Sequence, residues 1–193
     1  MTSTQVLLNP NKTKSIRELG KVNIDNLLPV IESLSQEVWD IDNNTKPNKF
    51  AVLNKTEHIV MTFVKELQDW TTSYNRPMWQ ILKKHIEPVL LEAVKPYEYE
   101  KGKFSRVMLA KLPAKQRIKI HADGNEKSTF PHKIHVPLVT NKNTFFYVGK
   151  VKRHFKKGYA YEVNNKSKHY AINNGDSDRI HLIFEYYNSL LYL

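Results

Sequence analysis

The sequence contains no cysteine. Disulfide bonds and metal sites built from thiolates, including structural zinc of the cysteine type, are therefore excluded. No stretch approaches the roughly 18 to 20 uninterrupted apolar residues that a membrane-spanning helix needs. Residues 1–15 alternate polar and apolar side chains and lack the hydrophobic run of a secretion signal. We therefore expect a protein without membrane spans that resides in the cytoplasm.

The composition is that of a globular protein. The 193 residues include 40% hydrophobic and 11% aromatic side chains, enough for a substantial core. The chain contains no internal repeat and no low-complexity tract. We expect one domain, 1–193, in which residues 1–100 form a mostly helical N-terminal support and residues 101–193 form the β core. Within the support, residues 1–22 read as an irregular or extended arm.

Basic residues outnumber acidic ones, with 30 Lys and Arg against 19 Asp and Glu and a formal net charge of +11. Such an excess attracts phosphate in a salt-dependent way, so a nucleic acid is one candidate partner. Only six of the 30 cations are Arg, whose planar guanidinium is usually favoured for specific phosphate recognition. The chain is also rich in Asn, which indicates a compositional bias. We therefore do not favour a nucleic acid as the substrate, and the charge alone names no other substrate class.

Helical periodicity marks two segments of the first half. Apolar residues recur at a spacing of three to four within residues 23–42, which predicts a helix with Asn23 as its N-cap. A second helix is predicted to open at Pro77, and Pro88 is expected to kink or divide it. Between the two helices, residues 58–64 read as a strand.

From residue 104 onward, short β-rich runs are separated by clusters of turn-forming residues. The expected strands are 105–112, 117–122, 133–140, 144–151, 158–163, 168–173 and 179–187. Helices followed by seven or eight strands are typical of an antiparallel barrel or jelly roll buttressed by helices.

Three of these strands, 117–123, 133–138 and 179–184, alternate polar and apolar residues. Successive strand residues point to opposite sides, so the polar residues share one face. These polar residues are Arg117, Lys119, His121, Asp123, Lys133, His135, Arg179 and His181. A half-exposed sheet explains the charges but not a histidine on each of the three faces. We therefore expect the apolar faces to pack against helices and the polar faces to line the mouth of a barrel.

His121 and Asp123 lie two positions apart and hence on the same side of one strand. A third ligand from another strand would complete a face of two histidines and one carboxylate. Such a face leaves positions on iron(II) open for a 2-oxo acid and oxygen. The candidates for the third ligand are His135, His154, His169 and His181.

His169 has the best context among these histidines. A hairpin centred on residues 174–175 would place His169 opposite Ile180 and hence beside Arg179. A 2-oxo acid that chelates a metal extends its far carboxylate away from the ion. The forked guanidinium of Arg179 is suited to receive that carboxylate through two hydrogen bonds.

An ordered set of motifs across roughly residues 100–187 resembles one known family. The motifs are His121-Ala-Asp-Gly124, Lys133-Ile-His-Val-Pro-Leu138, Gly149, Gly158, and Lys168-His169 through Arg179-Ile-His-Leu-Ile-Phe-Glu-Tyr186. In this order they resemble the aspartyl/asparaginyl β-hydroxylases, which are dioxygenases dependent on iron(II) and 2-oxoglutarate. The resemblance implies a mainly β fold with N-terminal helices, a double-stranded β-helix (a jelly-roll or cupin-like barrel) buttressed by helices.

The resemblance also implies roles for individual residues. His121 and His169, with Asp123, would bind iron(II), and Arg179 would anchor 2-oxoglutarate. His135 would lie in the cosubstrate site near the metal. The implied reaction consumes oxygen and 2-oxoglutarate, releases succinate and carbon dioxide, and hydroxylates an unactivated C–H.

Two positions depart from parts of this family. The animal aspartyl hydroxylases carry Gly where this chain has Asp123, whereas bacterial free-proline cis-4-hydroxylases, which this chain resembles more in its ligand set, keep the carboxylate. Both groups usually carry Arg where this chain has Lys133. Lys133 keeps the charge expected of a cosubstrate contact but lacks the guanidinium fork.

The substrate is expected to be an amino acid or a peptidyl residue of the proline or Asp/Asn type. Arg117, predicted on the face of His121, is a candidate for binding a substrate carboxylate. Two alternatives remain open. One is a cupin-like metal protein without 2-oxoglutarate chemistry; the other is a basic module that binds nucleic acid or protein.

Overall fold

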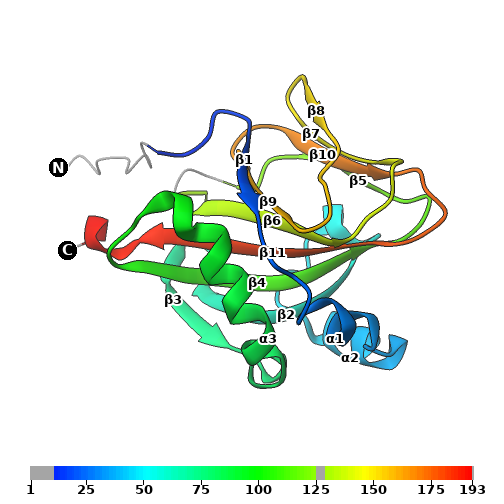
Figure 1. The fold of residues 1–193 in the computed structure, drawn as a ribbon, viewed down its shortest axis with the longest axis horizontal. Coiled ribbons are helices and arrows are strands. Elements are labelled where there is room, and N and C mark those ends of the chain that lie inside the picture. The colour runs from blue at the N-terminus through cyan, green and yellow to red at the C-terminus, as the bar shows by residue number, and fades with distance from the viewer. Residues whose placement is uncertain (1–10, 125–128, 193) are drawn as a thin grey trace.

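Two antiparallel sheets form the frame of the computed structural model, which describes residues 11–124 and 129–192 (Figure 1). The larger sheet has seven strands in the order β1-β9-β6-β11-β4-β2-β3, and the smaller has four in the order β5-β10-β7-β8. This architecture confirms the predicted mainly β, jelly-roll type of fold. None of the helices in these residues is long and apolar enough to cross a membrane.

The strands and helices have the following bounds. The strands are β1 (Ile16–Lys21), β2 (Glu57–Glu66), β3 (Asp69–Asn75), β4 (Gly102–Leu112), β5 (Arg117–His121), β6 (His132–Val139), β7 (Thr144–Val148), β8 (Val151–Arg153), β9 (Tyr159–Val163), β10 (His169–Asn173) and β11 (Arg179–Asn188). The α-helices are α1 (Leu28–Glu32), α2 (Gln36–Thr45) and α3 (Pro77–Val94), and the 3-10 turns are η1 (Ala51–Leu53), η2 (Lys95–Tyr97) and η3 (Ser189–Tyr192).

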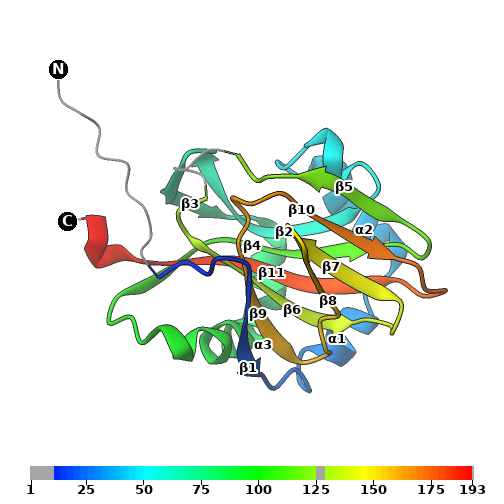
Figure 2. The same cartoon turned by 90° about the horizontal axis from the view of Figure 1, so that it is seen from above.

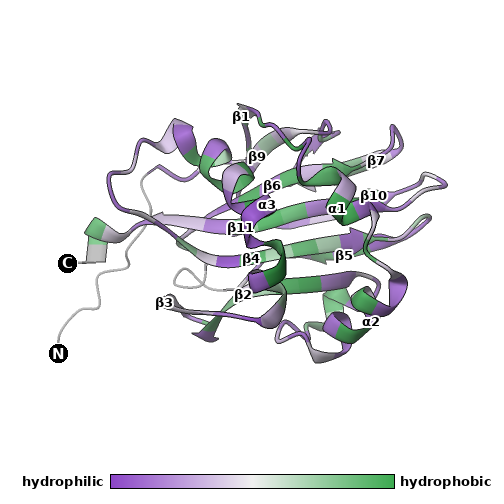
Figure 3. Cartoon of the chain, turned by 60° about the horizontal axis from the view of Figure 1, so that its bottom comes forward, coloured by the Kyte–Doolittle hydropathy of each residue, from purple (hydrophilic) through white to green (hydrophobic). Residues whose placement is uncertain are grey.

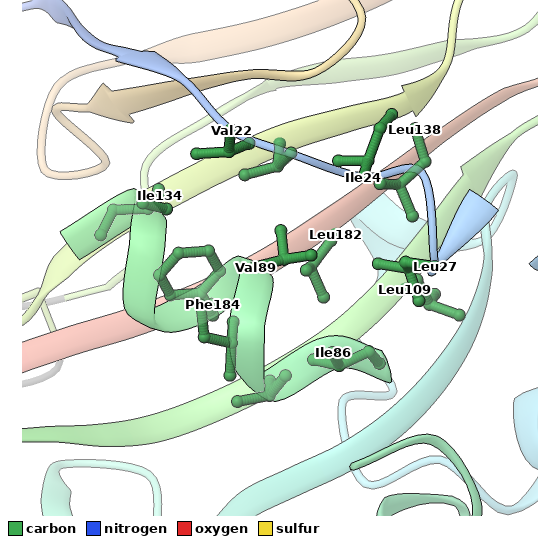
Figure 4. Packing of buried hydrophobic residues seen from close by; sticks show 14 of the residues in the cluster. Val22, Ile24, Leu27, Ile86, Val89, Leu109, Ile134, Leu138, Leu182 and Phe184 are labelled. Carbon is green, nitrogen blue, oxygen red and sulfur yellow. The ribbon is translucent and has the colours of Figure 1, made fainter. Parts of the chain in front are cut away.

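The main core lies between the helices and one face of the seven-stranded sheet. Ile86 and Val89 of α3 pack against Leu109, Leu182 and Phe184 of the central strands, all of them buried (Figure 4). Apolar residues of these strands lie under α1 and α3 in Figure 3. The apolar faces of β6 and β11 therefore pack against helices as predicted, and their polar faces point to the opposite side of the sheet.

The predicted helix over residues 23–42 is wrong in its extent. Two short helices, α1 and α2, take its place, and Asn23 lies outside both. Pro29 stands at the start of α1, where its missing N–H costs nothing. Ser35 adopts an extended conformation and caps α2 by accepting a hydrogen bond from a backbone N–H. In contrast, α3 runs through Pro88 without being divided.

The first half of the chain supplies strands as well as helices. β2 confirms the strand expected at residues 58–64 and occupies an inner position of the large sheet, with β3 at its edge. β1, within the predicted extended arm, pairs with β9, with Ile16 opposite Val163. Residues 1–10 of that arm lie outside the described residues. The N-terminal half therefore completes the large sheet and does not act only as a helical support.

The predicted pairing of the strands around residues 169 and 180 is wrong. β10 pairs with β5 and β7 in the small sheet, whereas β11 pairs with β4 and β6 in the large one. The segment between them crosses from one sheet to the other. Asn173 fixes this crossing: its buried amide donates to the carbonyl oxygens of Leu112, Pro113 and Ser177. A tight hairpin would not need a buried side chain with these hydrogen bonds to hold its connection.

β5 contains an irregularity that changes which residues face inward. His169 of β10 lies opposite His121, but Ala171 lies opposite Ile118, so β5 carries one extra residue between these pairs. Such a bulge breaks the two-residue alternation. Ile118 therefore shares the inner face with His121, while Ile120 is 62% exposed. The prediction that residues 117, 119, 121 and 123 share one face is wrong for this reason.

Candidate metal and cosubstrate site

A cavity of about 520 Å³ lies between the two sheets. The large sheet contributes residues of β2, β4, β6 and β11, and the small sheet contributes residues of β5, β7 and β10. The segment before β2 adds a third wall that includes Phe50 and Leu53. The cavity is lined by six of the seven residues that the sequence singled out as site residues: His121, Asp123, Lys133, His135, His169 and Arg179.

His121, Asp123 and His169 converge on one point of this cavity. One potential ligand atom from each residue lies within 4.8 Å of the other two. The Nε2 atoms of both histidines are 3.4 Å from Oδ1 of Asp123. β5 and β10 are neighbours in the small sheet, and His121 and His169 are directly paired across them. The pairing of β5 with β10 thus brings His169 to His121 and Asp123, which lie more than 40 positions before it in the chain.

The two imidazoles are held in the orientation that a metal ligand requires. Nδ1 of His121 donates to the carbonyl oxygen of Lys119 at 2.8 Å, and Nδ1 of His169 donates to that of Ser167 at 2.9 Å. A carbonyl oxygen only accepts, so in both rings Nδ1 carries the proton. The lone pair of each Nε2 is therefore directed at Asp123. Such backbone contacts are the usual outer support of metal-binding histidines.

Asp123 is fixed by contacts that leave one of its oxygens facing the histidines. Its backbone N–H donates to the carbonyl oxygen of Asn165 at 2.9 Å. Oδ2 accepts a hydrogen bond from the Asn165 amide at 3.2 Å and forms an ion pair with Lys133. Burial alone would raise the pKa of Asp123, but the ion pair with the Lys133 ammonium favours the charged form, and this pKa lies well below its usual range. The group is therefore a carboxylate at neutral pH.

Arg179 is a buried cation without a matching anion. It is 1% exposed, and its Nη2 contacts only the carbonyl oxygen of Ala110, at 3.5 Å. Its Nε has no hydrogen-bond partner, and no ion pair to it exists within residues 11–124 and 129–192. Burial lowers its pKa to about 10, which still leaves it charged at neutral pH. An uncompensated buried charge is costly, so this geometry suits a bound anion.

Two neutral histidines lie beside Arg179. The Nδ1 atoms of His135 and His181 are 3.4 Å apart, and both residues are buried. Burial, followed by the charges of Lys133 and Arg179, holds the pKa of His135 well below its usual value, and burial also depresses that of His181. The Nε2 of each ring is unpaired within the described residues. His135 thus brings an uncharged, unsatisfied polar atom to the cavity.

Arg117 and His154 lie away from the cavity. Arg117 is exposed and, because of the bulge in β5, is not among the lining residues. Nδ1 of His154 donates to the carbonyl oxygen of Thr144 at 2.9 Å. Of the four candidates for a third ligand, the structure thus brings His169 to His121 and Asp123.

Part of the cavity wall was not predicted from the sequence. Arg106 and Glu185 form a buried ion pair beside the cavity, and Oε2 of Glu185 also accepts from Ser105 Oγ at 3.0 Å. His58 lies in the wall formed by β2. A signal for Arg106 existed, because this cation directly precedes the apolar run Val107–Ala110 of its strand. His58 had none, since the strand expected at residues 58–64 was assigned to the N-terminal support and not to the β core.

Comparisons with solved structures support the fold. An oxidoreductase of the 2OG-Fe(II) oxygenase family from Burkholderia pseudomallei is 11% identical, with a TM-score of 0.54 over 69% of this chain and 66% of that one. The carbocyclase SnoK from nogalamycin biosynthesis, described as dependent on α-ketoglutarate, is 11% identical, with a TM-score of 0.53 over 96% and 83%. The non-heme monooxygenase ThoJ, solved with nickel, is 12% identical, with a TM-score of 0.54 over 90% and 74%.

Comparison by sequence assigns the family. No curated protein sequence matches the chain. The family model of the aspartyl/asparaginyl β-hydroxylases matches residues 70–189, which is more than half of the chain. This match spans the cavity-lining strands β4 to β11 and agrees with the order of motifs in the sequence. The chain therefore belongs to the aspartyl/asparaginyl β-hydroxylase family.

Proposed function

We propose that the protein is a dioxygenase that depends on iron(II) and 2-oxoglutarate and hydroxylates an unactivated C–H. Its family and fold indicate an oxygenase of this class. One observation carries the finer proposal. The cluster of His121, Asp123 and His169 shares a cavity with the buried, uncompensated guanidinium of Arg179. A metal site and an anion site in one cavity suit a dicarboxylate that chelates a metal.

The residues of the cluster fit iron(II). Two imidazole nitrogens and one carboxylate oxygen form the ligand set that is typical of non-haem iron oxygenases. His121, Asp123 and His169 would hold the ion, and their outer contacts fix the tautomer and the orientation of each ligand. When bound, iron(II) and 2-oxoglutarate supply the oxidising chemistry for the C–H bond.

The cosubstrate would be held by residues of the large sheet. Arg179 would receive the far carboxylate of 2-oxoglutarate, and the anion would compensate its buried charge. His135, neutral and with a free Nε2, would donate to or accept from the cosubstrate near the metal. Lys133 lines the same cavity, but its ammonium is engaged with Asp123. We therefore assign Lys133 first to positioning the ligand carboxylate.

The substrate proposed is an amino acid or a peptidyl residue of the proline or Asp/Asn type, in keeping with the family. The part of the cavity away from Arg179 combines apolar side chains, such as Phe63 and Met108, with the Arg106–Glu185 pair. Arg106 therefore offers a cation beside the cavity, whereas Arg117 lies outside it. Apolar walls also exclude water from the site, which strengthens the electrostatic contacts within it.

Anaerobic spectroscopy tests the proposal. Iron(II) and 2-oxoglutarate added together should produce a metal-to-ligand charge-transfer band. The band should be lost in His169→Ala and, at limiting cosubstrate, in Arg179→Met, but kept in the matched control His154→Ala. Air and a panel of amino acids and peptides should then yield succinate coupled to a hydroxylated product. Metal binding without the band would support the cupin-like alternative and contradict the proposed dioxygenase activity.

A further inference from the structure

The positive charge of the chain is concentrated in the segment that builds most of the small sheet. Residues 140–175 contain eight Lys and Arg and one acidic residue, Glu162, so this segment carries seven of the eleven net charges. All eight cations are exposed, whereas Glu162 is fully buried. No residue of β5, β7, β8 or β10 is acidic. Most of the net charge is thus carried by exposed side chains of this one segment, which we call the basic surface.

This basic surface is not covered by another element. Helices α1 to α3 lie on the outer face of the large sheet, but none of the described helices covers the outer face of the small one (Figures 1 and 2). β8, at the end of the small sheet, pairs with β7 on one side only, and all three of its residues are exposed. An edge strand of this kind presents backbone N–H and C=O groups that an added strand can bond.

The aromatic residues of this surface argue against nucleic acid as its partner. Proteins that bind single strands offer free ring faces on which bases stack. Here Tyr147 and Tyr170 stack on each other, with centroids 4.2 Å apart and planes 5° apart. The ammonium of Lys152 lies 3.9 Å from the centroid of Phe145. The rings thus already contact each other or a lysine. Seven of the eight cations are Lys, which lacks the fork suited to phosphate.

The open edge favours a polypeptide of opposite charge. Lysine on an edge strand usually prevents pairing with another copy of the same protein, because like charges would meet. The same charges attract a strand that carries Asp or Glu. We propose that β8 and its flanking cations Lys150, Lys152 and Arg153 dock an acidic polypeptide segment as an added strand. Backbone hydrogen bonds would hold the segment, and the cations would select its charge.

Fluorescence anisotropy with the full chain tests the proposal. The probes are a labelled acidic peptide with alternating Glu and Val, the same peptide with alternate backbone nitrogens methylated, and a single-stranded oligonucleotide of equal charge. The acidic peptide should bind more tightly than the oligonucleotide. Methylation keeps the charge but removes backbone donors, so it should weaken binding roughly tenfold or more if a strand is added.

Charge reversal locates the surface. The triple variant K150E/K152E/R153E should weaken peptide binding roughly tenfold or more. The matched control K83E/K84E/K95E makes the same change of net charge at exposed lysines of α3 and η2, and should weaken it less than about threefold. Iron(II) binding by both variants reports that the fold is intact. Tighter binding of the oligonucleotide, equal losses in the two variants, tolerance of methylation, or no peptide binding at low salt would each overturn the proposal. None of these results depends on turnover.

Discussion

Lys133 and Asp123 form an ion pair that leaves one carboxylate oxygen facing the two histidines. The ammonium contacts Oδ2 of Asp123, while Oδ1 lies 3.4 Å from the Nε2 atoms of His121 and His169. The side chains of Lys133 and Asp123 are 22% and 17% exposed, so water screens the pair only in part. Because Lys133 contacts Oδ2 and leaves Oδ1 facing the histidines, Lys133 is a positioning residue for the ligand set.

Lys133→Met should weaken iron(II) binding by roughly 10- to 100-fold, the effect expected when an outer contact of a metal ligand is removed. Lys133→Arg restores the charge and should recover most of the affinity. Titration of each variant with iron(II) under anaerobic conditions measures the change. Equal metal affinities in the wild type and Lys133→Met would show that the ion pair has no part in holding the ligand.

Arg179→Met should separate cosubstrate binding from stability. Loss of the cation should weaken 2-oxoglutarate binding by about 2 to 4 kcal/mol, which is roughly 30- to 1,000-fold. The ligand-free protein should be as stable as the wild type or more stable, because the substitution removes a buried charge that no described anion compensates. Urea unfolding with and without 2-oxoglutarate checks both effects. A large loss of stability without ligand would mean that the guanidinium has a structural role.

His58 should make the protein less stable in acid. Burial, aided by Lys46 and Arg179, lowers its pKa to about 3, whereas an unfolded histidine titrates near 6.5. Above pH 6.5 the residue is neutral in both states. As the pH falls toward 3, only the unfolded state gains the proton, so the free energy of unfolding falls by about 1.4 kcal/mol per pH unit.

His58→Gln removes this contribution. Between pH 7 and pH 5, the variant should lose about 2 kcal/mol less of its free energy of unfolding than the wild type does. Urea unfolding at the two pH values measures the difference. Identical pH dependence in both proteins would contradict the buried neutral state of His58.

The Arg106–Glu185 pair should be sensitive to loss of one partner. Its side chains are 10% and 7% exposed, so Arg106→Met leaves a buried carboxylate that has lost its ion-pair partner and keeps the hydrogen bond from Ser105, and should cost about 3 to 5 kcal/mol. The double variant R106M/E185L should be more stable than R106M. The exposed pair of Lys115 and Asp176 is the control, where Lys115→Met should cost less than about 1 kcal/mol. Similar costs for the two pairs would contradict this account.

The residues of the candidate site could be named from the sequence, but the way in which the fold brings them together could not. Residue type and spacing single out His121 and Asp123, and the order of motifs adds His169 and Arg179. The structure brings these four residues to one cavity. The reasoning that placed Arg179 beside His169 in a hairpin was nevertheless wrong, because the two residues belong to different sheets. Side-chain chemistry is a local property of the sequence, whereas strand pairing depends on competition among all strands.

Three further features could not be predicted from the sequence, each for a physical reason. The bulge in β5 adds one residue to a ladder, and nothing in an alternating pattern marks where an extra residue is accommodated. The break between α1 and α2 lies at Ser35, whose extended backbone and capping side chain begin α2, and the apolar periodicity conceals it. The wall that contains His58 comes from a strand whose position inside the large sheet is fixed only by long-range pairing.

The location of the cluster on one sheet and of Arg179 on the other has a mechanical consequence. His121 and His169 belong to the small sheet, and Arg179 begins a central strand of the large one. A dicarboxylate bound to both the metal and the guanidinium would connect the two sheets. The hydrogen bonds of Asn173, where the chain crosses between the sheets, help to set the distance that this ligand would span. Any change that spreads the layers apart would shorten the lifetime of the complex without touching a single liganding atom.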